Sequence, residues 1–582
     1  MNNKGVAIRY GDVAPEAKEN FKPTSDSAKF DTLAQLQKYN LNFPNYANPC
    51  ELYSVVLDGT AQAFPSVPGS ANLGLWSEQI SNDDGTFTEP IVLTLTSEGQ
   101  YSSQGFTFTF DTYNQIYPTH INIKWFRYAE GTMTELSPDG GVDFYPDNEF
   151  YFCRNFVEKY NKVVITFYSL NMPKNRLKLR VIDYGYGTFF YGDELRGVKL
   201  IQEIDPISTQ ISINTADFTL DSKSDIDVYS FQAKQPLSVY FDGQLKATTF
   251  VKKSTRKAKR LWSIQSEDYI GLLDSIPYYG GIYTNKNAVE LLTDIFTVAK
   301  VPYSIDDVFA DAVVTGYIPF TTCRDALMQV AFAIQAVVDT SNSEVIKVFA
   351  LEDDVKQTIP LNRIMQGQNF ADDETVTGVE VTVHSYKPIT ETIDVYDASE
   401  SGTGENIFVK FSEPLHDLSI TNGEIVSYGT NYAIIIANEN CLLSGQKYEH
   451  TTQTRRKNNP VVLASDIEKI VAIDNATLVS QYNIDNIIDK CYNWLIKTNT
   501  TNLKIVEGKH VEYGEAFKWG EHKWGTFKWG EKHPNVVTYD ERVNIGENIK
   551  AETEYSGVVS GRLIKQLFNL NGNIIIKEAV LK

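Results

Sequence analysis

The chain has 582 residues, of which 53 are Lys or Arg and 74 are Asp or Glu, so its formal net charge at pH 7 is −21. This acidity argues against a protein that holds nucleic acid through phosphate contacts, because that mode of binding needs a basic surface. It equally disfavours binding to an anionic membrane surface. The length predicts about three to five domains, and a hydrophobic content of 42% is enough for packed cores.

We expect neither a transmembrane helix nor a signal peptide for export. No stretch approaches the roughly 20 consecutive apolar residues that a transmembrane helix needs. The first ten residues lack the apolar core of a signal peptide, so export by that route is not expected. The five cysteines lie far apart without a Cys-x-x-Cys pair, which predicts free thiols in a reducing cytosol.

Sequence motifs of enzymes and of cofactor sites are absent. The chain has no Gly-x-Ser-x-Gly nucleophile elbow, no His-Glu-x-x-His zinc motif and no Gly-rich phosphate-binding loop. The acidic turn at 82–85 lacks the spaced ligands of a calcium-binding loop, and a plain turn is the preferred interpretation. We therefore predict no enzyme activity, no catalytic residue, no metal site and no cofactor.

The first two regions in chain order are an arm and a sandwich. Residues 1–48 are polar and irregular, and we interpret them as an N-terminal arm. Residues 49–189 carry strand signals: apolar and polar residues alternate at 106–110 and 121–125, and 163–168 have the pattern of a continuous, buried strand. Short strands separated by turn clusters predict a β-sandwich of jelly-roll type.

Residues 190–270 form a second strand-rich region. Asp242-Gly243 separates two of its strands, and this dipeptide favours a two-residue hairpin turn because both central residues need positive φ. A basic stretch follows, with six cations in nine residues: Lys252, Lys253, Arg256, Lys257, Lys259 and Arg260. We keep two interpretations of this stretch, namely a solvated hairpin loop and a contact with an acidic partner surface or with phosphate.

Residues 271–352 predict a small α/β domain. The first of its two amphipathic helices spans 287–299, where apolar residues recur at helical spacing on one face. Thr284 or Asn285 is the expected N-cap of this helix, because both side chains can accept a backbone hydrogen bond.

The second helix of this domain is expected at 323–338. It begins with Thr322 and carries Asp325 three residues later, a variant of the capping box with Asp in place of Glu. Leu327 and Ile334 fall on the same face of this helix, so we expect both to be buried.

The remainder of the chain divides into two regions. Residues 353–455 return to strand patterns, whereas 456–582 contain an amphipathic helix at 484–498 and end in two apolar runs. Those runs flank Asn571-Gly572, a dipeptide typical of two-residue hairpin turns, so a terminal β-hairpin is expected.

A local repeat lies within the last region. Residues 513–533 contain Lys-Trp-Gly three times at intervals of five residues, a period that fits neither a helix nor a strand. Trp519, Trp524 and Trp529 are candidate contacts for a glycan or a partner chain. The alternative is an edge hairpin, kinked at its glycines, whose aromatic rings pack on neighbouring strands.

Four segments resemble the central baseplate hub proteins of contractile tails, which occur in phages and phage-tail-like bacteriocins (tailocins) of Gram-positive bacteria. These segments are ELRGVKLIQEIDPISTQISINTADFTL (194–220), LWSIQSEDYIGLLDSIPYYGGIYTNKNA (261–288), GYIPFTTCRDALMQVAFAI (316–334) and YSGVVSGRLIKQLFNLNGNIIIKEAVLK (555–582). The resemblance extends roughly over residues 190–582.

The resemblance implies a mainly β fold with an α/β insertion. Two tube-like β-barrel domains, at 190–270 and 353–455, would flank the α/β domain at 271–352, and a C-terminal domain would occupy 456–582. Three copies would place six barrels around one axis and so adapt a sixfold tail tube to a threefold spike. The implied partners are two further copies of the chain, the tail tube protein, the spike protein and baseplate wedge proteins.

The implied location is the distal baseplate of a virion or tailocin particle made in the bacterial cytoplasm. No membrane anchoring is expected, and DNA would at most pass through an acidic central channel, whose walls would repel phosphate. The N-terminal region, 49–189, faintly resembles discoidin-like or galactose-binding sandwiches at 57–59 and Trp76-Ser77. It would attach the hub to wedge or spike proteins, or bind cell-wall glycan through candidates such as Trp76.

The sequence therefore predicts a structural, trimeric baseplate hub. The alternative is a glycan- or receptor-binding tail-tip protein that uses the sandwich at 49–189 or the tryptophan repeat at 513–533.

Overall fold

A computed structural model describes most of the chain, and backbone contacts divide it into two compact units. The described residues are 5–13, 15–26, 28–30, 74–112, 114–129, 131–192, 194–222, 234–241, 243–398, 405–460, 468–516, 532–539, 543–570 and 575–582. Unit 1 comprises residues 1–194 and 235–245, and unit 2 comprises 195–234 and 246–582.

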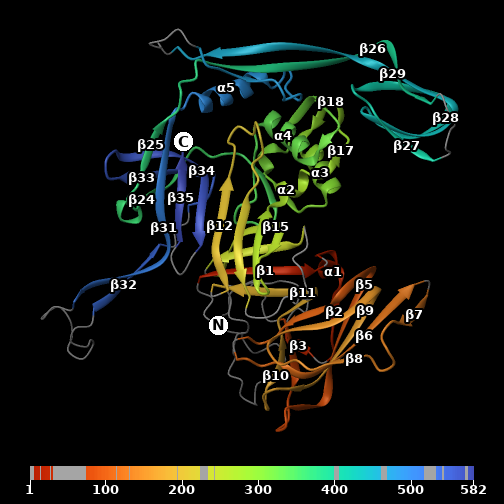
Figure 1. Ribbon diagram of the computed structural model, residues 1–582, viewed down its shortest axis with the longest axis vertical. Coiled ribbons are helices and arrows are strands. Elements are labelled where there is room, and N and C mark those ends of the chain that lie inside the picture. Colours follow the sequence, from red (N-terminus) through yellow and green to blue (C-terminus); the bar gives the residue numbers. More distant parts are fainter. Residues whose placement is uncertain are drawn as a thin grey trace. The chain divides into compact units, whose positions relative to one another are not determined.

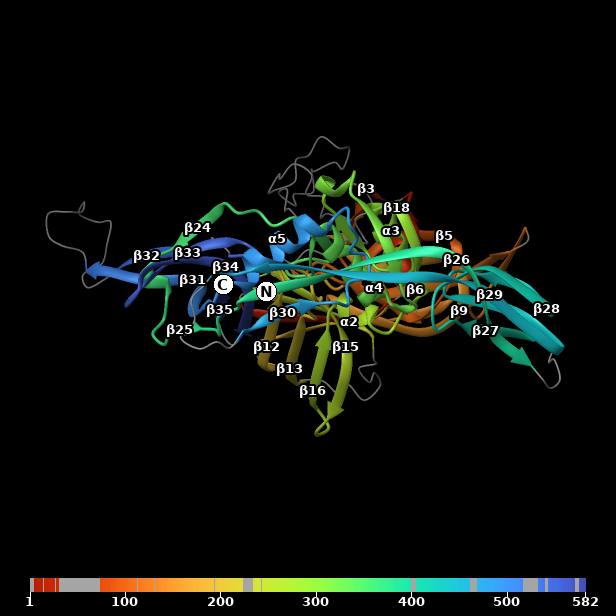
Figure 2. The same cartoon turned by 90° about the horizontal axis from the view of Figure 1, so that it is seen from above.

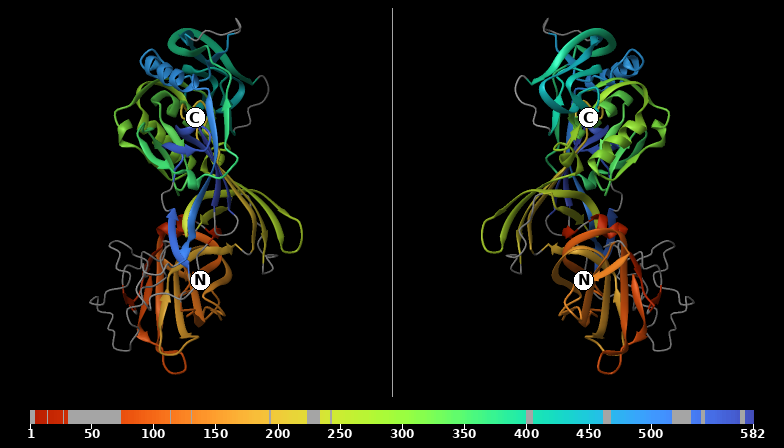
Figure 3. Two further views of the ribbon diagram at one scale, coloured as in Figure 1. Left: turned by 90° about the vertical axis from the view of Figure 1, so that its left-hand side faces the viewer. Right: turned by 90° about the vertical axis from the view of Figure 1, so that its right-hand side faces the viewer.

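Unit 1 is a β-sandwich, as the alternating patterns predict (Figure 1, Figure 3). In its larger sheet β9 pairs with both β5 and β6, while β11, β2, β7 and β8 extend the sheet. The strands are β2 (Lys22–Thr24), β5 (Thr86–Thr109), β6 (Pro118–Ala129), β7 (Thr132–Glu135), β8 (Val142–Phe144), β9 (Phe150–Leu170) and β11 (Val181–Tyr191). The smaller sheet contains β3 (Ala28–Phe30), β4 (Leu75–Ile80) and β10 (Arg176–Leu179).

The core of unit 1 lies between these sheets and is rich in aromatic residues. Phe106 stacks on Trp125 with ring centroids 5.9 Å apart, and it meets Tyr184 edge-on at 5.3 Å. Leu75 of β4 and Leu179 of β10 are fully buried in the same cluster. Burying large rings supplies most of the free energy that stabilises such a sandwich.

The N-terminal residues are built into unit 1 instead of forming an irregular arm throughout. Strand β1 (Val6–Val13) pairs with β11 on one side and with β14 (Pro236–Phe241) on the other. Helix α1 (Pro15–Asn20) follows. Strand pairing is not visible in this segment's composition, because its partners lie about 180 and 230 residues away along the chain.

An ion cluster fixes this N-terminal segment to the sandwich. The Asp183 carboxylate on β11 accepts hydrogen bonds from Arg9 of β1 at 2.5 Å and from Lys18 of α1 at 2.7 Å. The Asp183 side chain is only 2% exposed. Burial alone would raise the pKa of this carboxyl, but the two cations outweigh burial and hold the pKa below its usual range.

Unit 2 brings together strands from opposite ends of its sequence. Strand β12 (Leu195–Glu203) pairs with β13 (Thr215–Asp221) on one edge and with β34 (Gly557–Leu570) on the other. Strand β13 pairs with β16 (Leu261–Glu267), which pairs with β15 (Gln244–Arg256). The β15–β16 hairpin projects from the remainder of unit 2 in Figure 2.

The terminal hairpin is confirmed. Strand β34 pairs antiparallel with β35 (Ile575–Leu581), and β35 pairs with β31 (Asn499–Ala516). The expected turn, Asn571-Gly572, lies outside the described residues. In the other predicted turn, Gly243 has a φ of 76°, as such a turn requires, whereas Asp242 lies outside the described residues.

The α/β part of unit 2 contains three helices and several short strands. Its helices are α2 (Tyr269–Leu273), α3 (Ala288–Ala299) and α4 (Cys323–Ile334). Its strands are β17 (Pro277–Tyr278), β18 (Gly281–Asn287), β19 (Tyr303–Ile305), β20 (Val313–Ile318), β21 (Thr321–Thr322), β22 (Val337–Asp339) and β23 (Ile346–Phe349), with a 3-10 turn at Asp307–Phe309. Together with the β-rich remainder, these elements confirm a mainly β fold with an α/β part.

Both predicted helices of this region exist, with local corrections. The N-cap of α3 is Asn287, whose side chain accepts from the backbone N–H of Glu290, so the expectation of Thr284 or Asn285 is wrong. Helix α4 ends at Ile334 because Gln335 turns left-handed with φ 61°. The expected end at 338 is therefore wrong.

The predicted cap of α4 is confirmed, and it provides a test. The Thr322 hydroxyl accepts from the backbone N–H of Asp325 at 3.1 Å. We expect Thr322→Ala to destabilise the fold by about 1 kcal/mol, because one helix N–H loses its partner. Thr322→Ser keeps the hydroxyl and is expected to restore most of the loss in urea unfolding; equal losses in both variants would contradict the cap.

The residues expected to form a second barrel are divided between two sheets. Strands β24 (Val355–Ile359) and β25 (Asn369–Asp372) pair with β33 (Asn548–Thr553) and β31, respectively. The strands after 377 form a separate five-stranded sheet instead. It contains β26 (Gly378–Ala398), β27 (Asn406–Lys410), β28 (Leu415–Tyr428), β29 (Tyr432–Asn458) and β30 (Ile470–Ile473).

A long antiparallel pair of strands dominates this second sheet. Strands β26 and β29 pair from Gly378↔Asn458 to Ala398↔Cys441, and β27 and β28, which lie between them in sequence, are at the far end of the pair in Figure 1. Helix α5 (Ile484–Leu495) packs near the opposite end of this strand pair. The remaining strand, β32 (Lys532–Tyr539), pairs with β31.

Candidate functional site

Helix α5 presents two chemically different faces. Its apolar residues Ile484, Ile487, Ile488 and Cys491 are buried and belong to one cluster with Val379 and Val381 of β26. Its other face carries side chains spaced by three or four residues, as one side of a helix requires. These side chains are Asn486, Asp489, Lys490, Asn493 and Trp494.

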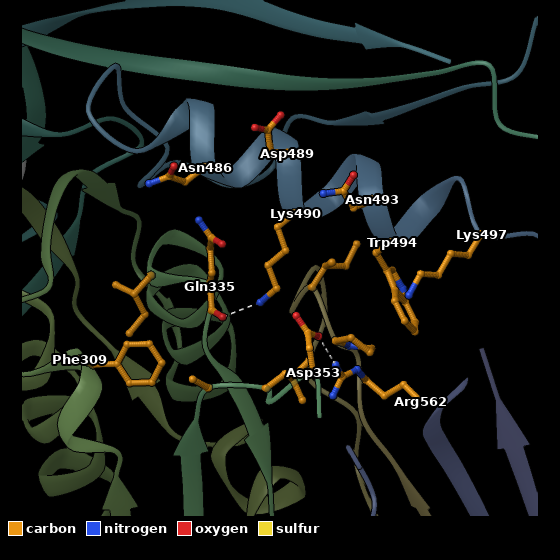
Figure 4. A pocket seen from close by; sticks show the side chains of 15 residues that line it. Phe309, Gln335, Asp353, Asn486, Asp489, Lys490, Asn493, Trp494, Lys497 and Arg562 are labelled. Carbon is orange, nitrogen blue, oxygen red and sulfur yellow. Dashed lines mark hydrogen bonds and ion pairs between the residues drawn. The ribbon is translucent and has the colours of Figure 1, made fainter. Parts of the chain in front are cut away.

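A cavity of about 690 Å³ lies against this second face, within unit 2. Its size falls in the range typical of small-ligand sites, about 300–1,000 Å³. Figure 4 shows the lining side chains, which come from α5, from the end of α4 and from the segments around 206, 351 and 562. Apolar contributions come from Pro206, Ile207, Phe309, Ile334, Ala350, Leu351 and Trp494.

Lys490 points from α5 into this cavity (Figure 4). Its ammonium group donates a hydrogen bond to the backbone carbonyl of Gln335 at 2.5 Å. Burial lowers the pKa of Lys490 to about 8, although the nearby Asp205 acts in the opposite direction. Within the described residues Lys490 forms no ion pair, and its ammonium group has no direct counterion there.

A second pair of basic side chains borders the cavity. Arg562 of β34 is buried and forms three hydrogen bonds: it donates to the carbonyls of Glu352 and Gly546 and to the Asp353 carboxylate at 2.8 Å. Lys497 follows α5, and its ammonium lies 5.1 Å from the centre of the Trp494 ring. Burial lowers the pKa of Lys497 as well, with the charge of Arg562 as a further cause.

The lining combines apolar surface, hydrogen-bonding amides and cations. Asp489 and Asp353 are the acidic members, and each already meets a cation: Asp489 pairs with Lys457, and Asp353 pairs with Arg562. In the part of the chain that the structure describes, the cavity charges without a direct counterion are therefore positive, and they belong to Lys490 and Lys497. Such a site suits a ligand with an apolar body and one negative charge.

The sequence candidates lie away from this cavity. Trp76 is 1% exposed, and the ammonium of Lys178 lies 4.9 Å from its ring centre. The Trp76 ring is therefore part of the core of unit 1 and does not present a surface for glycan. Trp519, Trp524 and Trp529 lie outside the described residues, between Ala516 and Lys532, which pair across β31 and β32.

The basic stretch belongs to the β15–β16 hairpin of unit 2. Its six cations are exposed, three on β15 and three in the turn. Lys252 forms an ion pair with Glu267 at 2.6 Å, and the Arg256 guanidinium lies 5.4 Å from the Trp262 ring centre. The hairpin is confirmed, whereas a contact of this stretch with a partner stays a prediction.

Sequence reasoning missed the cavity although it located helix α5. The spacing of Lys490, Trp494 and Lys497 at i, i+4 and i+7 was visible and places three functional side chains on one side. No pattern connects them to Gln335 or Arg562, because long-range folding alone brings those residues to the helix.

Unit 1 carries an exposed aromatic stack that no sequence pattern predicted. The His120 ring lies between those of Tyr145 and Tyr168, with centroids 5.0 and 4.5 Å away and nearly parallel planes. His120 contacts the Asp143 carboxylate at 2.9 Å, and Asn122 donates to the same carboxylate at 3.0 Å. Tyr145 is 65% exposed, so its ring offers a flat surface beside polar groups.

Three observations bear on other classes of site. Among the described residues no group of three or more His, Cys, Asp or Glu side chains could hold a metal ion. Four cysteines fall in the described ranges, Cys153, Cys323, Cys441 and Cys491, and all four are buried free thiols. No helix in the described part of the chain has the length and apolarity that a membrane crossing requires.

Comparison with known proteins gives structural neighbours only. No family model matches the chain, and no curated protein matches its sequence. Among solved structures, a tail protein from Neisseria meningitidis is similar over 67% of this chain and 91% of its own, with 11% identity and a TM-score of 0.38.

Two other solved neighbours are also tail proteins. A 43 kDa tail protein of prophage MuSo2 from Shewanella oneidensis is similar over 67% of this chain and 95% of its own, with 8% identity and a TM-score of 0.39. The prophage tail protein gp18 from Listeria monocytogenes is similar over 68% and 91%, with 12% identity and a TM-score of 0.36.

Proposed function

We propose that this chain is a structural protein of a phage or tailocin tail, and specifically a trimeric baseplate hub that joins a sixfold tail tube to a threefold spike. Its further partners would be wedge proteins, and its place would be the distal end of the particle. The role is non-enzymatic: the chain would act through its shape and its interfaces.

One observation carries the proposal. The four segments that resemble baseplate hubs are far apart in sequence, yet they fold within unit 2. The first and last of them pair directly, because residues 198–203 of β12 bind 565–570 of β34. The second supplies β16, which pairs with β13 of the first, and the third supplies α4. The resemblance therefore follows one continuous structure instead of scattered short matches.

Assembly of the chain tests this proposal. Mass photometry of the recombinant full-length chain is expected to show a species at three times the chain mass of 65.6 kDa. In particles, cryo-electron microscopy is expected to place the chain at the distal end of the tail tube with threefold symmetry. A chain that stays monomeric at every concentration and is missing from the particle would contradict the hub.

A second candidate function is glycan or receptor binding by unit 1, and the aromatic stack favours it. Sugar rings present apolar faces that pack on aromatic rings, while hydroxyl groups need polar partners nearby. The stack of Tyr145, His120 and Tyr168 provides an aromatic surface for the sugar ring. Asp143 and Asn122 provide polar partners for its hydroxyl groups.

A variant of the outer tyrosine tests this candidate. Tyr145→Ala is expected to abolish co-sedimentation of the chain with purified cell-wall polysaccharide. Tyr128→Ala is the matched control, because Tyr128 is 54% exposed in the same sandwich and takes no part in the stack. Equal binding by both variants, or no binding by the unmodified chain, would remove this function from unit 1.

A further inference from the structure

The cavity beside α5 has the chemistry of a binding site. Its floor is apolar, its rim carries amides, and two cations face it without a carboxylate partner among the described residues. Placing an ammonium group in a partly buried, partly apolar setting is costly unless a negative group meets it. Lys490, half-buried on α5, bears this cost most directly, and Lys497, exposed just beyond the end of α5, adds a second positive charge at the same cavity. The two charges together favour an anionic ligand.

The other lining residues restrict the kind of anion. Asp353 and Asp489 lie at the same cavity, so a ligand with several negative charges, such as a phosphate, would meet repulsion as well as attraction. Asn486, Asn493 and Gln335 offer donors and acceptors together, which suit the N–H and C=O groups of a peptide. The indole of Trp494 and the side chains of Phe309 and Leu351 offer apolar contacts.

We propose that this cavity binds a short peptide segment of a partner protein, in which one Asp or Glu carboxylate meets Lys490 and Lys497. A neighbouring aliphatic side chain of the segment packs on the apolar floor. The site itself is derived from unit 2 alone, and the inference rests on the proposed function only for the source of the segment, which would be another tail component.

Lys490 provides the central contact. Among the described residues, one of its three N–H donors has a partner, the carbonyl of Gln335, so two donors remain for the ligand carboxylate. Lys497 is more exposed, at the rim, and approaches the ligand from the Trp494 side. Arg562 takes no direct part, because the Asp353 carboxylate and two carbonyls occupy its guanidinium group.

Photo-crosslinking to the full-length chain tests the proposal. The probe is acetyl-photoleucine-Glu-Leu-amide, and its control is the same peptide with Gln in place of Glu. Mass spectrometry is expected to locate crosslinks of the Glu probe on residues of α5 and around 351. The Gln probe is expected to label about tenfold less, because hydrogen bonds between charged groups are stronger than neutral ones.

Matched variants identify the contact. Lys490→Met keeps an unbranched, flexible side chain, one atom shorter and without the charge, and is expected to reduce labelling about tenfold. Lys497→Met serves as the second variant at the exposed rim, where folding is least affected, and a several-fold loss is expected. Lys550→Gln removes an exposed lysine from β33 outside the cavity and is expected to label like the unmodified chain.

Three results would overturn the inference. They are equal labelling by the Glu and Gln probes, unchanged labelling of both cavity variants, and competition by free acetate at the same concentration as effective as that of the unlabelled peptide. The last would indicate a site for small carboxylates instead. The labelling uses the isolated chain, so the two proposals can fail separately. A chain that binds the probe but never trimerises would support the cavity site and contradict the hub. A chain that trimerises without binding the probe would support the hub and contradict the cavity site.

Discussion

Replacing Asp183 with Asn is expected to destabilise unit 1 by about 3–5 kcal/mol, because it removes the charge of a buried carboxylate that pairs with both Arg9 and Lys18. The substitution is expected to detach β1 and α1 first, because each of them donates a side-chain hydrogen bond to the Asp183 carboxylate. Hydrogen exchange followed by mass spectrometry on residues 6–20 and on β11 measures it. Asp139→Asn, an exposed change in the same sandwich, is the control. Unchanged protection of β1 in the Asp183 variant would contradict the role of the cluster.

The same cluster predicts an acid dependence of stability. The pKa of Asp183 is lower in the folded chain than in the unfolded chain, whose ordinary value is about 3.9. Its stabilising contribution is therefore complete above that ordinary value and is lost as the pH falls through the lower, folded-state pKa. We expect the difference in unfolding free energy between the native chain and Asp183→Asn to be constant at neutral pH and to shrink in strong acid.

Replacing Leu327 with Ala is expected to cost about 2–5 kcal/mol of stability in unit 2, because it leaves a cavity where the side chain is completely buried. Ile334→Ala is expected to cost less, since Ile334 is only partly buried at the end of α4. Val298→Ala is the matched control, because the Val298 side chain on α3 is 45% exposed. Urea unfolding followed by circular dichroism measures all three, and a native-like midpoint for Leu327→Ala would contradict the helix packing.

Local sequence signals predicted local structure well. Helices α3, α4 and α5 begin at or within one residue of the expected positions, because amphipathic spacing and capping residues act over a few positions. The terminal hairpin was equally visible, since its strands are adjacent in sequence. The cap of α3 was misplaced because Thr284, Asn285 and Asn287 can all cap a helix, but β18 extends through 284 and 285 and ends at Asn287.

Long-range pairing was not predictable in the same way. Nothing in the polar N-terminal segment shows that β1 inserts between β11 and β14. Strands β24 and β25 look like neighbours of β26, yet they join β33 and β31 more than 130 residues later. The cavity has the same origin, because α5 supplies Lys490 whereas Gln335 and Arg562 arrive from distant strands and helices. The fold of a mainly β chain depends on strand pairs of this kind, and local patterns in a single sequence do not identify the partners.

The pairing of β12 with β34 also constrains how the chain is made. Residues 198–203 are synthesised long before 565–570, so this edge of β12 stays unpaired while the residues between them are made. Unpaired strand edges are templates for aggregation, and contacts of such long sequence separation form slowly. A chain that ends before β34 is therefore expected to expose this edge of β12 and to aggregate, instead of forming a smaller working subunit.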